Sequence, residues 1–90
     1  MNKEKLQAAF AELCHAQSQQ SEKVHELWTT MEYCQGVVTR MVRDPEVDVT
    51  SHRLSSEIEL LRQFKKDLND AEAKFDTLSR AIEALEAILV

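Results

Sequence analysis

Apolar residues recur along the first half of the chain at alternating intervals of four and three residues. In a seven-residue repeat with positions a to g, this spacing fills positions a and d, which is typical of α-helices packed in a coiled coil. One repeat differs, because Gln17 and Gln20 occupy its a and d positions. We therefore expect a helix over about residues 3–43, with two glutamines that either form a register-setting layer or mark a hinge. The apolar core positions are Leu6, Phe10, Leu13, Val24, Leu27, Met31, Cys34, Val38 and Met41.

The second half carries the same pattern. Glu57 is its one charged d position, near the start. This pattern predicts a second helix over about residues 51–89, so two stretches of about 40 residues each carry a stripe of core positions. Its apolar core positions are Leu54, Leu61, Phe64, Leu68, Ala71, Phe75, Leu78, Ile82, Leu85 and Leu89.

The only proline of the chain, Pro45, separates the two patterns. Proline has no N–H and disfavours helical geometry at the preceding residue, so the first helix should end near Arg43 and a turn should occupy about residues 44–50. Ser51 is a candidate cap for the second helix, and the run from Ser56 to Glu59 matches a capping box. Because so short a connection makes neighbouring helices antiparallel, we predict an all-α, long antiparallel helical hairpin forming one domain over residues 1–90. A continuous 90-residue helix is the alternative that Pro45 disfavours.

Apolar residues also spread onto the e and g positions that border the core stripe. Examples are Trp28 and Ile58 at e, and Leu60 and Ile88 at g. This apolar surface is wider than one partner helix covers, so we expect self-association or another protein to complete a helical bundle. The candidate partner-binding residues are Trp28, Met31, Cys34, Ile58, Leu60, Ile88 and Leu89.

Composition and charge narrow the choice of partner. The net charge is -5, and most of the acidic surplus lies in residues 45–90, which hold ten acidic and six basic residues. Because the basic residues are dispersed, with Lys65 and Lys66 the only adjacent pair, we expect no binding to nucleic acid. The cluster of Asp67, Asp70 and nearby acids leaves an acidic nucleic-acid mimic as a minor alternative.

The sequence also bears on location. Its first residues hold no apolar run of signal-peptide length, and no segment approaches the roughly 20 apolar residues of a membrane span. Cys14 and Cys34 stand 20 residues apart on one predicted helix, too far for a disulfide. We therefore expect a soluble, cytoplasmic protein with reduced thiols that does not bind membranes.

Two Glu-x-x-His spacings raise the question of a metal centre. Glu12 with His15 and Glu22 with His25 match the spacing found in di-iron helical bundles. Their heptad positions (c, f, f and b) all point away from the core, whereas a buried metal site requires inward side chains. We therefore predict no metal, no cofactor and no catalytic residues, and hence no enzyme.

These expectations together favour a protein-interaction function. The first hypothesis is a small acidic adaptor or chaperone-like module that binds an amphipathic helix of another protein. The alternative is a homodimeric four-helix bundle that acts as a scaffold or assembly component.

Overall fold

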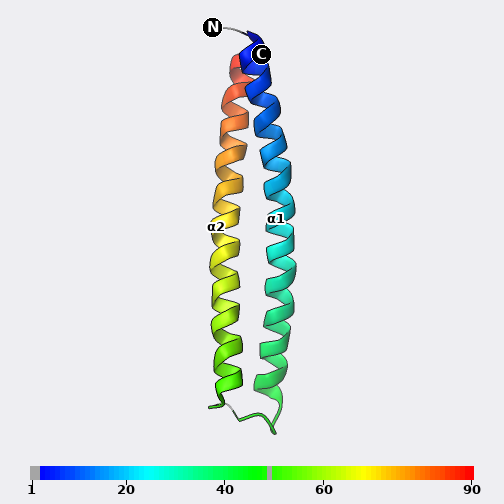
Figure 1. Cartoon of the computed structure of the whole chain (residues 1–90), viewed down its shortest axis with the longest axis vertical. Coiled ribbons are helices and arrows are strands. Elements are labelled where there is room, and N and C mark those ends of the chain that lie inside the picture. Colours follow the sequence, from blue (N-terminus) through cyan, green and yellow to red (C-terminus); the bar gives the residue numbers. More distant parts are fainter. Residues whose placement is uncertain (1–2, 49) are drawn as a thin grey trace. The chain divides into compact units, whose positions relative to one another are not determined.

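The computed structural model describes residues 3–48 and 50–90 and has two helices joined by a turn. Helix α1 is Lys3–Arg43 and helix α2 is His52–Leu89, and the chain reverses its direction between them (Figure 1). The all-α helical hairpin predicted from the heptads is thus confirmed. Its completion to a bundle stays a prediction. Met1, Asn2 and Val49, which belong to the predicted domain and turn, lie outside the described residues.

The helices form two compact units. The hairpin unit, His25–Asn69, contains the second part of α1, the turn and the first part of α2. The terminal unit contains residues 3–24 and Asp70–Val90, which come from the two ends of the chain. Each unit pairs one segment of α1 with one segment of α2, and each is described by itself below.

Helix α1 ends where proline interrupts its hydrogen bonds. The Asp44 N–H still donates to the Arg40 carbonyl oxygen at 3.1 Å, which closes the last helical turn. Pro45 follows and has no N–H to continue the ladder. The Asp44 carboxylate then accepts a hydrogen bond from the Glu46 N–H at 2.9 Å, a local bond that replaces helical pairing. The chain therefore leaves α1 at the residue that the proline predicts.

Helix α2 begins with a serine cap. The Ser51 hydroxyl accepts a hydrogen bond from the Leu54 N–H at 3.2 Å, so Ser51 caps the helix and His52 opens it. Just before the cap, the Asp48 carboxylate accepts bonds from the Thr50 hydroxyl and N–H, and these bonds lower the pKa of Asp48. The run from Ser56 to Glu59, which matches a capping box, lies inside α2 and does not start it, whereas the predicted start near Ser51 agrees with the structure.

The core is a thin stripe. Every described a and d position of the two heptad patterns is buried or half-buried. The most buried apolar side chain, that of Leu54, still exposes 3% of its surface. Two packed helices leave each core side chain open toward the flanks, so the stripe leaves apolar surface uncovered. The buried apolar residues are Cys34, Met41, Leu54, Leu68, Ala71 and Ile82.

Outward positions are mainly polar. The charged b, c and f positions are exposed, and Tyr33 at c is 71% exposed, as its heptad position predicts. Within residues 3–48 and 50–90, neither helix holds a stretch that is apolar and long enough to cross a membrane.

Candidate functional site

An open groove of about 470 Å³ runs along α1 in the hairpin unit. One wall is a row of residues spaced four apart, namely Trp28, Glu32, Gly36 and Arg40. The other wall is a second row with the same spacing, namely Met31, Gln35 and Thr39. Rows of this spacing are the ridges of a helix surface, and the groove between two of them accepts a ridge of another helix. We call this open groove the α1 groove.

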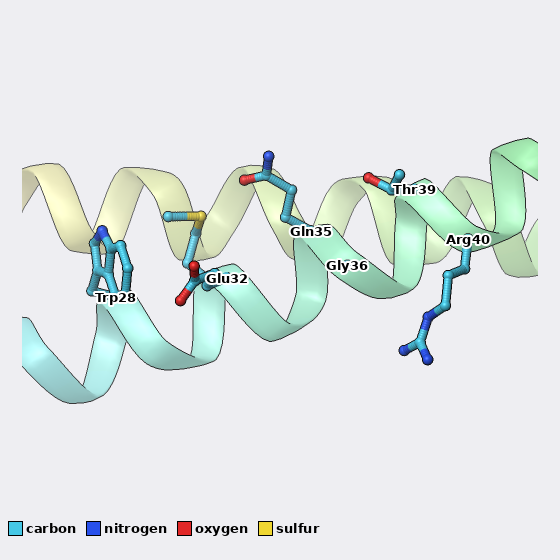
Figure 2. A pocket seen from close by; sticks show the side chains of 7 residues that line it. Trp28, Glu32, Gln35, Gly36, Thr39 and Arg40 are labelled. Atoms are coloured by element: carbon cyan, nitrogen blue, oxygen red, sulfur yellow. The ribbon is translucent and has the colours of Figure 1, made fainter.

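The side chains around the α1 groove point in different directions. Figure 2 shows Gln35 and Thr39 on one side of α1, Arg40 extending to the opposite side, and Trp28 at one end of the groove. Glu32 and Arg40 are both exposed. The groove therefore has an aromatic end, an amide and hydroxyl wall, and one charge of each sign.

Gly36 is the one residue of the groove lining without a side chain. It lies inside α1 with no positive φ, so the backbone does not require glycine there. A Cβ atom added at Gly36 would meet nothing within 4 Å, so no neighbour in the chain requires it either. Glycine inside a helix costs about 0.5–1 kcal/mol relative to alanine. Among the described residues, neither the backbone conformation nor a close neighbour explains that cost.

The candidate interaction residues of the hairpin unit fall into three environments. Trp28, which is 46% exposed, and the half-buried Met31 line the α1 groove. Leu60 is also 46% exposed, and Ile58 is half-buried. Cys34 is buried in the core of the unit and is absent from the groove lining. Trp28 and Met31 are thus brought together, whereas Cys34 is part of the helix–helix packing.

The other two candidates belong to the terminal unit. Ile88 is 60% exposed and Leu89 is half-buried, near the end of α2. The α1 groove and Leu60 belong to the hairpin unit instead. The terminal unit therefore carries its own exposed apolar position.

Sequence reasoning missed several residues of the α1 groove. It did not single out Glu32, Gln35, Gly36, Thr39 or Arg40 as interaction residues. The signal that marks them is the four-residue spacing around the chain's only glycine, on the outer face of a helix where alanine would be more stable. Heptad analysis follows the core stripe and therefore overlooks this outer face.

Gln17 and Gln20 form a hydrogen-bonded layer in the terminal unit. The Gln20 side-chain amide, 6% exposed, donates to the Ala71 carbonyl oxygen at 2.9 Å. The Gln17 amide donates to the Ser79 hydroxyl, also at 2.9 Å. Of the two readings left open by the sequence, these bonds support the layer that sets register, because each glutamine has a specific partner on the opposite helix.

A related contact involves Cys34 in the hairpin unit. Its thiol donates to the Glu57 carbonyl oxygen at 3.8 Å. Burial, and secondarily the Glu57 carboxylate, raise the pKa of the Cys34 thiol above its usual range. A thiol that stays protonated is a poor nucleophile, and Cys34 packs in the core of the hairpin unit.

Alkylation should distinguish the two free cysteines. In the folded chain, we expect iodoacetamide to modify half-buried Cys14 at least about tenfold faster than buried Cys34. Burial raises the pKa of the Cys34 thiol in the folded chain above its value in the unfolded chain. The contribution of this thiol to the free energy of unfolding is therefore fully present below the unfolded-chain pKa and is lost as pH rises through the folded-chain pKa. Timed alkylation followed by peptide mass spectrometry measures both rates, with the denatured chain as the control. Equal rates in the folded chain would show that Cys34 is accessible.

The two Glu-x-x-His pairs lie on exposed faces of α1. Glu12, His15, Glu22 and His25 are all exposed, as their heptad positions predict. No group of three or more histidine, cysteine or carboxylate side chains gathers around a point within residues 3–48 and 50–90.

Comparison with known proteins adds no relative. No protein-family model matches the chain, and neither the curated proteins nor the solved structures include a match. The function is therefore argued from the chain's own surface.

Proposed function

We propose that this protein is a non-enzymatic interaction module, an acidic adaptor or chaperone-like protein that binds an amphipathic helix of a partner protein. The observation that carries the proposal is the exposure of large apolar side chains at e positions of the hairpin unit. Trp28 is 46% exposed and Val42 is 54% exposed. Burying a fully exposed side chain of this kind gains about 1.5–3 kcal/mol, and because each is already about half covered, roughly half of that gain is available to a further helix at this place.

These side chains share one flank of the hairpin unit. In an antiparallel helix pair, the e positions of both helices border the same side of the core. Trp28 and Val42 on α1 therefore lie on the side that Ile58, at e on α2, also borders. We call this surface, defined by Trp28, Val42 and Ile58, the e flank. An amphipathic helix whose apolar face covers the e flank would bury all three residues.

The charge of the chain favours a basic partner. The net charge of -5 attracts a helix whose polar face carries lysine or arginine, and it speeds the encounter more than it strengthens the complex. Both cysteines are free thiols, which fits the cytoplasmic location that we propose.

Truncation of Trp28 tests the proposal. Tryptophan at the centre of an interface commonly accounts for 2 kcal/mol or more of binding, so we expect Trp28→Ala to weaken partner binding at least about tenfold. The immobilised chain is first used to capture partners from extracts of its source, with quantitative mass spectrometry. Affinity for the captured protein is then measured by calorimetry.

Tyr33→Ala is the matched control. It removes an aromatic side chain that is 71% exposed at a c position, away from the e flank, so binding should remain at the wild-type level. Circular dichroism should show both variants to be as helical as the wild type. If Trp28→Ala binds the partner as tightly as Tyr33→Ala does, the e flank is not the binding surface.

A further inference from the structure

The α1 groove has a charge pattern that is complementary to itself. Glu32 precedes Gly36 by four residues, and Arg40 follows it by four. A twofold axis through Gly36 of two antiparallel α1 helices exchanges position 32 with position 40. Each Glu32 then faces the Arg40 of the other copy, and two opposite-charge pairs flank the two glycines.

We propose that a second copy of this chain docks on the α1 groove, antiparallel, with the two Gly36 residues at the crossing point. This inference goes beyond the helix-binding function proposed above. Because Trp28 lines the α1 groove and also belongs to the e flank, a second copy and a partner helix would compete for Trp28. Charge complementarity specifies the partner, since a contact made twice across a twofold axis is the usual form of a homodimer interface.

The charges also select the direction of the second helix. A parallel arrangement about Gly36 would place Glu32 opposite Glu32 and Arg40 opposite Arg40, and like charges in contact are unfavourable. The antiparallel arrangement replaces both repulsions with attractions. The same three positions therefore specify the orientation of the dimer as well as its contact point.

Glu32 and Arg40 are available for these contacts. Both are exposed, and among residues 3–48 and 50–90 neither side chain has a hydrogen-bond or ion-pair partner. Eight residues of helix separate their backbones by about 12 Å, so they do not pair with each other on one helix. Arg40 extends to the opposite side of α1 from Gln35 and Thr39 (Figure 2). A partner's carboxylate can reach it there.

The shape of the α1 groove suits a close helix crossing. Both of its walls are rows of residues spaced four apart, and interlocking of such rows gives a crossing angle of about 50°. At Gly36 the missing side chain lets the two backbones approach, and the space there is open. In the dimer, Gly36 would allow the close approach of the two backbones, which explains a glycine at this position.

The expected dimer is weak and depends on salt. Two exposed ion pairs contribute little each and are screened as ionic strength rises. We therefore expect a monomer–dimer equilibrium that shifts toward monomer on dilution and on addition of salt. Sedimentation velocity of the full chain over a concentration series at low and high salt measures this shift. A wild-type chain that is monomeric throughout would overturn the proposal.

Reversal of each charge provides the decisive test. The variant with E32R presents two cations beside Gly36, and the variant with R40E presents two anions. Each should self-associate at least about tenfold more weakly than the wild type, because both attractive pairs become repulsive. A one-to-one mixture of the two variants should recover dimerisation, since cations then face anions at all four positions. A mixture that stays monomeric would refute the pairing of Glu32 with Arg40.

E12R is the matched charge control. It changes the net charge as much as E32R does, at an exposed c position of α1 in the terminal unit. Its dimer affinity should equal that of the wild type within about twofold. Loss of dimer in E12R to the same degree would mean that overall charge, and not the α1 groove, controls association.

Gly36→Ala separates helix stability from docking. The added methyl group meets open space in the single chain, so helicity should be retained or increased. At the crossing point the same methyl group holds the two backbones apart, so dimerisation should fall several-fold. If Gly36→Ala dimerises as well as the wild type, the crossing is not at Gly36. E32R and R40E leave Trp28, Val42 and Ile58 unchanged, and loss of the dimer frees Trp28, so both variants should capture the partner helix at least as well as the wild type. Weaker capture together with weaker dimerisation would count against the helix-binding function and leave the dimer proposal standing.

Discussion

Replacing Leu54 with alanine is expected to lower the free energy of unfolding by about 2–5 kcal/mol. Leu54 is 3% exposed and packs in the core of the hairpin unit, close to the turn. Truncation removes buried methyl groups and leaves a cavity that two helices fill only in part. Because the core is a thin stripe, few other contacts compensate for the loss. Urea unfolding followed by circular dichroism at 222 nm, the usual helix signal, measures the change.

Leu60→Ala is the control for this prediction. It makes the same chemical change in the same helix and the same unit, but at a side chain that is 46% exposed. Its effect should stay within about 1 kcal/mol, because much of the side chain is already in water. Equal losses in the two variants would mean that Leu60 is covered in solution. A concentration series would then show whether self-association covers it.

The double substitution of Gln17 and Gln20 by leucine is expected to raise the free energy of unfolding by about 1–2 kcal/mol. Leucine at these core positions gains apolar burial, while two hydrogen bonds of about 1 kcal/mol each are lost. No buried acceptor is left without a partner. The Ala71 carbonyl lies inside α2 and keeps its helical bond, and Ser79 still donates to the Phe75 carbonyl oxygen.

Gln19→Leu is the control for the glutamine layer. Gln19 is exposed, so the same change there should alter stability by no more than about 0.5 kcal/mol. The layer should also fix the register of the two helices. In the wild type, a shifted register would leave a buried glutamine without its hydrogen-bond partner, whereas an all-apolar stripe tolerates shifted registers. If the double variant is less stable than the wild type, the hydrogen-bonded layer contributes more than apolar packing does.

The proposed binding surface was predictable from the sequence only in part. Trp28 was identified from the sequence because an apolar e position widens the core stripe, and it is exposed at the end of the α1 groove. Cys34 was a candidate for the same surface but is buried. Cys34 occupies a d position, and d positions face the neighbouring helix. How completely the neighbouring helix covers such a side chain depends on the tertiary structure.

The sequence by itself determined the two helices and their ends. A strict spacing of four and three residues selects helices that bury one stripe, and Pro45 ends the first helix because it has no N–H to donate. These are local effects that depend on nearby residues along the chain. Tertiary structure alone decided the partners of Gln17 and Gln20, the burial of Cys34 and the open space beside Gly36. Each of these depends on which atoms of a distant segment come near, and the spacing of residues along one helix does not contain that information.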